Sequence, residues 1–90
     1  MLVIVAYDIP DNKRRREVFR CLKDFGEPRL RSVFECWVDP STFAQLQREL
    51  AWLVESQEDS VRCYLLCAHC ERRVAAHKRR PRGYREAVIL

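Results

Sequence analysis

The chain has 90 residues, 48% of them hydrophobic and 33% charged, with a formal net charge of +4 and a pI of about 9.0. This composition excludes a disordered chain and a multidomain protein, and the apolar run near the amino end is too short to span a bilayer, so we expect one soluble, cytoplasmic domain. The positive charge favours an anionic partner such as nucleic acid, and the small core favours dimerisation.

The first predicted element is a strand that ends in a carboxylate. Residues 2–7 form an uninterrupted apolar run rich in β-branched side chains, which is typical of a strand buried on both faces. Asp8 follows where the run stops, at the expected carboxyl edge of a sheet. A carboxylate there is costly unless a cation, a hydrogen-bond network or a metal ion compensates it. Asp8 is therefore a candidate metal ligand, and a simple turn cap is the alternative.

A basic helix is predicted next, with Asp11 as its N-cap and Gly26 as its stop. Its apolar spacing predicts a buried stripe of Val18, Phe19, Leu22 and Phe25. Four cations, Lys13, Arg14, Arg15 and Arg16, occupy the first turn, where the helix dipole disfavours positive charge. Because they gain nothing for the helix there, phosphate contact is favoured over a merely solvated helix end.

Residues 29–38 read as extended, either as one bent strand or as a tight hairpin. Asp39 and Pro40 start a second helix that fades by about Glu55, and residues 61–67 form another strand. The apolar stripe of this second helix is Phe43, Leu46, Leu50 and Leu53. This order predicts an α+β class: a ferredoxin-like two-layer sandwich with two helices on one face of a mostly antiparallel sheet.

The tail differs in composition from the predicted domain of residues 1–71. Residues 72–85 are dominated by arginine and lysine, and Pro81 and Gly83 interrupt regular structure. Residues 87–90 are apolar and form a short strand, which pairs either with its own sheet or with that of a partner subunit. We therefore expect residues 72–90 to be a basic arm that binds nucleic acid or a partner, with a plain solvating tail as the alternative.

The five cysteines are an odd number, which argues against a disulfide framework and favours reduced thiols. Cys67 and Cys70 have the spacing of half a structural zinc site. The second half is poor, because Cys63 would share a strand face with Cys67 and His77 stands alone in the tail. Reduced thiols are therefore favoured over zinc.

Five short motifs stand at spacings found together in one known family: Tyr7-Asp8-Ile9-Pro10-Asp11, the basic run with Arg15, Leu22-Lys23-Asp24-Phe25-Gly26, Ser32-Val33-Phe34-Glu35-Cys36 and Glu58-Asp59-Ser60-Val61-Arg62. With these motifs, residues 1–70 resemble the CRISPR-associated protein 2 family, the small subunit of the spacer-acquisition machinery. The resemblance implies a ferredoxin-like homodimer. It also implies that the aspartates ending the first strands, Asp8 here, face each other across the two-fold axis and hold Mg2+ or Mn2+ for phosphodiester hydrolysis.

By position, the resemblance assigns catalysis and metal binding to Asp8, and places Tyr7 beside it. Glu17 stands where some members have a second basic residue, for which Arg14 and Arg16 compensate. Phe34 is either a contact to nucleic acid or a core residue, and Trp37 is assigned to the core or an interface. The full set of predicted nucleic-acid contacts is Tyr7, Arg14, Arg15, Arg16, Arg29, Arg31 and Phe34.

The sequence thus predicts a CRISPR adaptation protein. It is expected to be a metal-dependent endonuclease that cleaves RNA or DNA and binds DNA together with the CRISPR integrase subunit. The first alternative is a non-catalytic scaffold whose basic surfaces hold DNA in the integrase complex. The second is a ribonuclease toxin of similar fold that acts alone.

Overall fold

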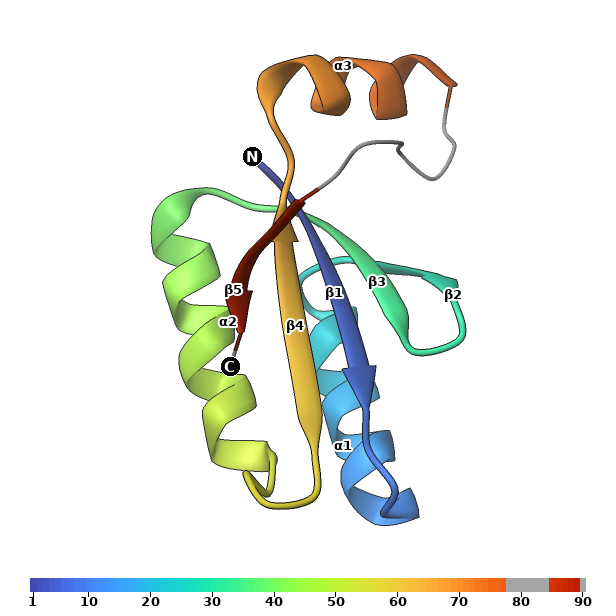
Figure 1. Ribbon diagram of the computed structural model, residues 1–90, viewed down its shortest axis with the longest axis vertical. Helices are drawn as coiled ribbons and strands as arrows, with labels where there is room; N and C mark the ends of the chain where they lie inside the picture. The colour runs from blue at the N-terminus through green and yellow to red at the C-terminus, as the bar shows by residue number, and fades with distance from the viewer. Residues whose placement is uncertain (78–84, 90) are drawn as a thin grey trace.

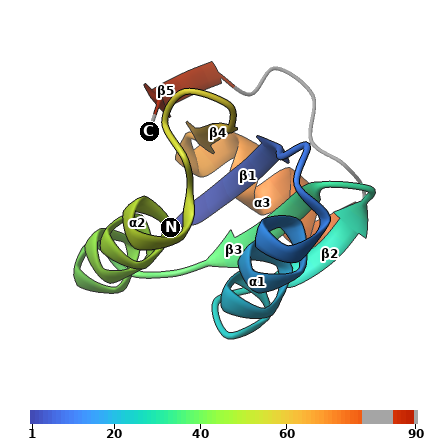
Figure 2. The ribbon, with the colours of Figure 1, turned by 90° about the horizontal axis from the view of Figure 1, so that it is seen from below.

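The computed structural model describes the backbone of residues 1–77 and 85–89, and the side chains of residues 1–72. A five-stranded antiparallel sheet, in the order β2-β3-β1-β4-β5, carries α1 and α2 on one face (Figures 1 and 2). The predicted ferredoxin-like α+β sandwich is confirmed. In chain order the elements are β1 (Leu2–Asp8), α1 (Asn12–Lys23), β2 (Glu27–Leu30), β3 (Val33–Trp37), α2 (Pro40–Leu53), β4 (Ser60–Leu65), α3 (Ala68–His77) and β5 (Arg85–Ile89).

β1 lies at the centre of the sheet, between β3 and β4. Its side chains alternate between the two faces, as a period of two requires. Val3, Val5 and Tyr7 pack into the main core beneath α1 and α2. Leu2 and Ile4 join a second, smaller cluster. We call the face that carries Leu2 and Ile4 the open face, because α1 and α2 do not cover it.

Both long helices begin at the predicted N-caps. The Asp11 carboxylate accepts a hydrogen bond from the Arg14 backbone N–H at 2.9 Å, and Asp39 accepts one from the Thr42 N–H at 2.7 Å. These bonds satisfy amide groups that the first turn of a helix leaves without partners. Of the predicted stripe on α2, Phe43, Leu46 and Leu50 are buried and Leu53 is partly buried.

The extended segment that the sequence left undecided is a hairpin, in which β2 and β3 are joined at Arg31 and Ser32. Ser32 has a positive φ of 62°, a left-handed conformation uncommon for residues other than glycine. This sharp reversal lets the chain leave β2 and return along it as β3 after only two residues. It brings the turn opposite α1, where it helps to form a pocket.

The prediction that the chain is irregular from residue 72 is wrong for residues 72–77. They belong to α3, which lies beyond the carboxyl end of β4 (Figure 1). Glu71, Arg72 and the alanines that follow are good helix formers, whereas Pro81 and Gly83 come later and lie outside the described residues. α3 also spans the boundary placed between residues 71 and 72, and the division into domain and arm stays a prediction.

The last strand pairs with its own chain, which decides an alternative that the sequence left open. β5 is antiparallel to β4, with Val88 opposite Cys63 and Arg85 opposite Leu65. It begins at Arg85, two residues before the predicted apolar patch. No helix in the described part of the chain is long and apolar enough to cross a membrane.

Candidate nucleic-acid interface

Asp8 lies at the exposed end of β1, at the rim of the sheet. On the neighbouring strand β4, Ser60 lies opposite Asp8. Because side chains alternate along a strand, Asp8 shares the open face with Ile4, whereas Tyr7 turns to the opposite face beside α1. The strand thus presents an accessible carboxylate on one side and a phenol on the other, at the same end of the sheet. The accessible position fits the predicted role of Asp8, which stays a prediction.

A pocket of about 460 Å³ lies between α1 and the β2–β3 turn. Five of the seven predicted nucleic-acid contacts line it, so residues distant in the sequence are brought together here. Those five are Tyr7, Arg15, Arg16, Arg31 and Phe34, and the remaining lining residues are Phe19, Arg20, Leu30 and Ser32.

The inner part of the pocket is aromatic. Phe34 is almost fully buried, and the exposed Phe19 ring meets it edge-on with 5.3 Å between ring centroids. The predicted burial of Phe19 in the helix stripe is wrong, since the ring is 39% exposed. Burial raises the pKa of Tyr7, and a hydrogen bond with Ser32 and the charge of Arg15 oppose that rise only in part. Tyr7 therefore stays a neutral phenol at physiological pH.

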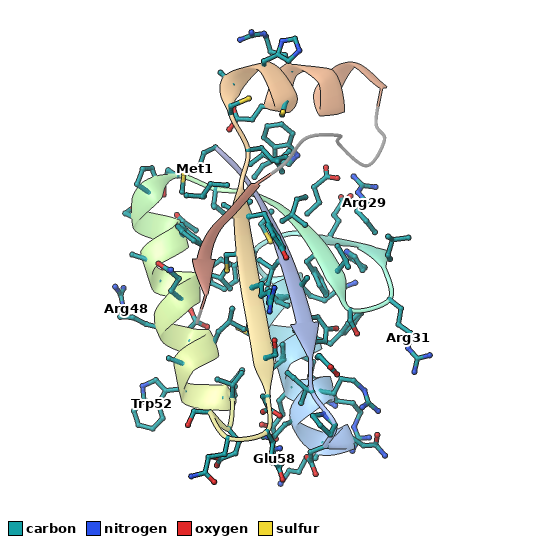
Figure 3. All side chains as sticks on the ribbon, viewed as in Figure 1. Met1, Arg29, Arg31, Arg48, Trp52 and Glu58 are labelled. Carbon is teal, nitrogen blue, oxygen red and sulfur yellow. The ribbon has the colours of Figure 1, made fainter. Side chains whose placement is uncertain are left out.

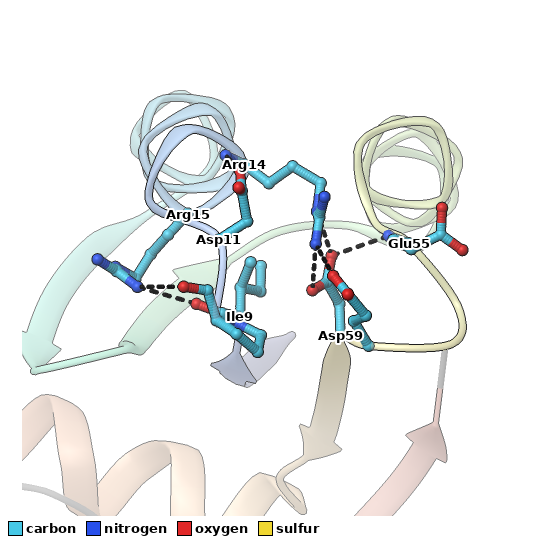
Figure 4. Close-up of polar contacts among 8 residues, drawn as sticks. Ile9, Asp11, Arg14, Arg15, Glu55 and Asp59 are labelled. Carbon is cyan, nitrogen blue, oxygen red and sulfur yellow. Dashed lines mark hydrogen bonds and ion pairs between the residues drawn. The ribbon is translucent and has the colours of Figure 1, made fainter.

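The arginines of the pocket fall into two groups. Arg15 is held in place, because its guanidinium donates to the backbone carbonyls of Ile9 at 3.0 Å and Pro10 at 3.4 Å (Figure 4). It also contacts the Asn12 side chain. Arg16 and Arg31 are exposed, and no partner for either is found among the described residues. Figure 3 shows Arg31 extending from the β2–β3 turn into solvent. The exposed pair is the better placed to bind an incoming anion.

Arg14 lies outside the pocket and binds other parts of the protein. Its guanidinium donates to Asp59 at 2.9 Å and to Glu58 at 2.6 Å, which ties the start of α1 to the loop before β4 (Figure 4). These two acids hold the pKa of Arg14 above its usual range. The structure gives Arg14 a role in packing, and its contact with nucleic acid stays a prediction.

Arg29 also lies outside the pocket, on the exposed β2. Its guanidinium pairs with the buried Glu35 at 3.0 Å and with Glu27 at 3.2 Å, and hydrogen bonding to Glu35 raises its pKa. The Trp37 indole N–H also donates to Glu35, at 3.2 Å. Arg29 thus balances a carboxylate on the open face, while its predicted contact with nucleic acid stays untested. Trp37 is 48% exposed, which excludes the core for that ring, and its place in an interface stays a prediction.

We expect acid to weaken the contact between α1 and the loop before β4 through Asp59. Burial alone would raise the pKa of this shielded carboxyl, but hydrogen bonds from the Arg14 side chain and the Glu55 N–H lower it below its usual range. A lowered pKa adds stability at pH values above about 4, and this stability is lost as the pH falls through the folded-state value.

Urea unfolding between pH 3 and 7 should therefore show a smaller pH dependence in Asp59→Asn than in the unchanged protein. At neutral pH, the substitution should cost about 1–3 kcal/mol, because the Arg14 guanidinium loses the better shielded of its two ionic partners. An unchanged pH profile in Asp59→Asn would contradict this role.

A comparison with known proteins identifies the family. The family model for CRISPR associated protein Cas2 matches residues 1–74, most of the chain. This chain belongs to the Cas2 family.

The relatives agree with this assignment. A protein of Synechocystis sp. named CRISPR-associated endoribonuclease Cas2 3 is 43% identical over 68 residues, which cover 76% of this chain and 74% of the relative. A Thermus thermophilus protein named CRISPR-associated endonuclease Cas2 2 is 39% identical over 70 residues, 78% of each chain. The crystal structure of Streptococcus pyogenes Cas2 superposes with a TM-score of 0.74 at 37% identity, covering 82% of this chain and 95% of that one.

The described part of one Cas2 chain does not form a complete metal site. It contains no cluster of three or more histidine, cysteine, aspartate or glutamate side chains able to surround an ion. Asp8 supplies one accessible carboxylate, whereas Mg2+ prefers six oxygen ligands in octahedral geometry. Among the described residues, Cys67 and Cys70 likewise have no third histidine, cysteine or acidic side chain with which to bind a metal ion. Water, phosphate oxygens or a second carboxylate would have to supply the other ligands of a divalent ion at Asp8.

Four pocket residues were not predicted as site residues from the sequence: Phe19, Arg20, Leu30 and Ser32. Phe19 and Arg20 follow Arg16 at positions i+3 and i+4, which places all three on one face of a helix. This spacing indicates a mixed aromatic and basic helix face. The same Phe19 also fits the apolar stripe, so the pattern does not assign it to that face. Leu30, which is 51% exposed, is recognised only once the hairpin is known.

Proposed function

We propose that this chain is a metal-dependent endonuclease that hydrolyses phosphodiester bonds of RNA or DNA as a homodimer. The observation that carries the proposal is the placement of Asp8 on the rim of the sheet, next in sequence to a residue that lines the arginine-rich pocket. Membership of the Cas2 family, whose similar members are named endoribonuclease or endonuclease, supports it.

The open face supports a homodimer. Val33 and Trp37 lie on the open face of β3, with Ala6 opposite Val33 and with the Glu35–Arg29 ion pair between them. Trp37 is exposed, and Ala6 and Val33 are only partly covered. A second copy seated on this surface would bury these side chains, and apolar burial is the main driving force of association. The same contact would bring the two Asp8 carboxylates near the two-fold axis.

In such a dimer, two Asp8 carboxylates would hold Mg2+ or Mn2+, with water and a phosphate oxygen completing the ligands. The bound ion would activate water for attack on phosphorus and neutralise the charge that develops there. Arg16 and Arg31 would hold flanking phosphates through charge-assisted hydrogen bonds. Such contacts position a strand without reading its sequence, so we expect little sequence preference.

The exposed Phe19 ring offers a stacking platform for an unpaired base. The Lys23 ammonium, on the same helix, lies 5.9 Å from the centroid of this ring, which is within cation–π distance. Because every base has an aromatic face, stacking of this kind is tolerant of sequence. It favours a single strand or a frayed end over an intact duplex at this pocket.

We expect Phe19→Ala and Arg31→Ala each to weaken binding of a labelled single strand by about tenfold. A stacked base contributes roughly 1–3 kcal/mol, and a charge-assisted hydrogen bond contributes a similar amount. Arg31→Ala should also reduce the slope of log affinity against log salt by about 0.7, the value for one phosphate contact on a single strand.

The matched control for these two variants is Arg48→Ala. Arg48 is exposed on α2, on the side of the molecule opposite Arg31 (Figure 3). Fluorescence anisotropy with one oligonucleotide over a series of salt concentrations measures all three proteins. Equal losses in Arg48→Ala and Arg31→Ala would mean that binding follows net charge alone, and that the pocket has no special part in it.

Within the CRISPR system, we propose that the protein also binds DNA together with the integrase subunit during spacer acquisition. Family membership and the cations of residues 72–85 support this role. Co-purification of the two proteins from cells that express both, with and without a DNA duplex, tests it. Failure to associate under either condition would contradict the partnership and leave the proposed nuclease activity intact.

The nuclease proposal is tested by incubating the whole chain with labelled single-stranded RNA and duplex DNA. Magnesium, manganese or a chelator is added in parallel reactions. The expected result is cleavage of at least one substrate with a metal ion and none with the chelator. Tight binding without cleavage under every condition would overturn the proposal and leave a DNA-holding scaffold.

A further inference from the structure

Two cysteine sulfurs lie next to each other where β4 leads into α3. Cys67 immediately precedes α3 and Cys70 lies in its first turn, with 3.4 Å between their sulfur atoms. The Cys70 backbone N–H also points to the Cys67 sulfur, at 3.5 Å. This pair is separate from Asp8 and from the pocket, so its chemistry does not depend on the proposed nuclease activity.

The two thiols differ in accessibility. Cys67 is exposed, whereas Cys70 is buried beside Leu2 and Leu66. A reactive dithiol needs this arrangement, in which an exposed sulfur reacts with the reagent and a shielded sulfur next to it then forms the disulfide. The hydrogen bond from the Cys70 N–H and the contact with the Cys70 thiol lower the pKa of Cys67, which favours its thiolate.

The other three cysteines have the opposite environment. Burial raises the pKa of Cys21 and of Cys63 to about 11, and that of Cys36 to about 12. Cys36 and Cys63 are completely buried in the main core, and Cys21 is partly covered. These thiols should be inert, so the chain contains its own internal controls.

The backbone around the pair is fixed. The Glu71 carboxylate accepts a hydrogen bond from the Leu2 N–H at 2.8 Å, which ties the first turn of α3 to the start of β1. A disulfide requires the sulfurs to approach to about 2.05 Å. Because the sulfurs are already in contact, side-chain rotation closes most of that gap and the strand and helix need not separate.

We propose that Cys67 and Cys70 form a redox-active dithiol that exchanges with small-molecule disulfides such as oxidised glutathione. The Cys67 thiolate attacks one sulfur of the disulfide, forms a mixed disulfide and releases one thiolate, which takes up a proton. The Cys70 thiolate then attacks the Cys67 sulfur and releases the second thiolate. Two protein thiols are oxidised to one disulfide, and one small-molecule disulfide is reduced to two thiols.

The difference in rate between the cysteines follows from their thiolate fractions. Hydrogen bonding to Cys70 holds the pKa of Cys67 below the ordinary value of a thiol, whereas burial raises that of Cys21 to about 11. At neutral pH the thiolate fraction of Cys67 is therefore much greater than that of Cys21. The lower intrinsic nucleophilicity of a less basic thiolate cancels roughly half of this difference on a logarithmic scale. Cys67 should still react about tenfold faster, before the shielding of Cys21 adds to the difference.

The test uses the reduced whole chain, mixed with oxidised glutathione, and follows thiol loss and intact mass over time. The unchanged protein should lose two of its five thiols and form a Cys67–Cys70 disulfide, found by peptide mapping and reversed by dithiothreitol. Cys70→Ser should stop at a mixed disulfide on Cys67. Cys67→Ser should lose thiols at least about tenfold more slowly, and Cys21→Ser should behave like the unchanged protein.

Three results would overturn the proposal: a mixed disulfide that persists in the unchanged protein, disulfides between chains through Cys67, or equally fast loss at Cys21, Cys36 and Cys63. Circular dichroism verifies that each variant is folded. If serine at the buried position unfolds the protein, Cys70→Ala replaces it, and the peptide map of the unchanged protein decides the outcome in either case.

Discussion

Replacing Asp8 by asparagine should lower the rate of RNA or DNA cleavage by about 100-fold or more, and leave folding and nucleic-acid affinity unchanged. Asparagine keeps the size of the side chain and removes the charge that would bind a divalent cation, and losing a metal ligand removes water activation and charge neutralisation together. Asp8 is exposed at a strand end, so its loss should not disturb the core. Initial rates at saturating substrate, with binding measured in parallel, give the result.

The matched control for Asp8→Asn is Asp24→Asn. Asp24 is an exposed acid at the other end of α1, where it forms the C-cap, and it has the same charge. Its variant should cleave at the original rate. Equal activity in Asp8→Asn and the unchanged protein would contradict the assignment of Asp8 and favour a scaffold.

Gly26→Ala should destabilise the fold by about 3 kcal/mol, a large effect for a single methyl group. A Cβ atom at this position would lie 2.3 Å from the backbone oxygen of Glu35, and 2.6 and 2.9 Å from the Sγ and Cα atoms of Cys36. Two of these atoms belong to the backbone of β3, which lies inside the sheet between β2 and β1 and has little room to shift. Urea unfolding at neutral pH should show the loss as a lower midpoint.

Glu27→Ala is the control for this prediction, since Glu27 is the next residue and is exposed. It should change the free energy of unfolding by less than about 0.5 kcal/mol. If Gly26→Ala and Glu27→Ala unfold at the same urea concentration, the close approach of Gly26 to β3 does not matter for stability.

The sequence predicts that Gly26 matters because it ends the first helix, and this is only part of the reason. The pattern assigns it to stopping the first helix, and α1 does end just before it, with the Gly26 N–H bonded to the Leu22 carbonyl. The stronger requirement is the contact with β3, which depends on how two separate segments pack. Local patterns contain no information about that approach.

The elements that the sequence predicted well are those set by local chemistry. The apolar run of β1, the N-caps Asp11 and Asp39, and the rim position of Asp8 all follow from short-range patterns. The sequence does not predict α3, because Pro81 and Gly83 predict irregular structure in the basic tail that follows its helix-forming residues.

The sequence predicted most of the residues of the candidate site, but not which of them line the pocket and which form ion pairs elsewhere. Arg14 and Arg16 are close together in one basic run, yet one pairs with Asp59 and Glu58 while the other lines the pocket. Which member of a run is held by ion pairs depends on the loop before β4, whose two acids are 44 and 45 residues away from Arg14 in the sequence. Only the tertiary structure separates these roles.

The central claim is that two copies of Asp8 form one metal site, and the stoichiometry of manganese binding tests it most directly. Titration of the whole protein with Mn2+, followed by electron paramagnetic resonance and combined with a measurement of mass in solution, should show one ion for two chains. Asp8→Asn should remain dimeric and lose that ion. A monomeric protein, one ion for each chain, or binding that persists in Asp8→Asn would contradict the claim.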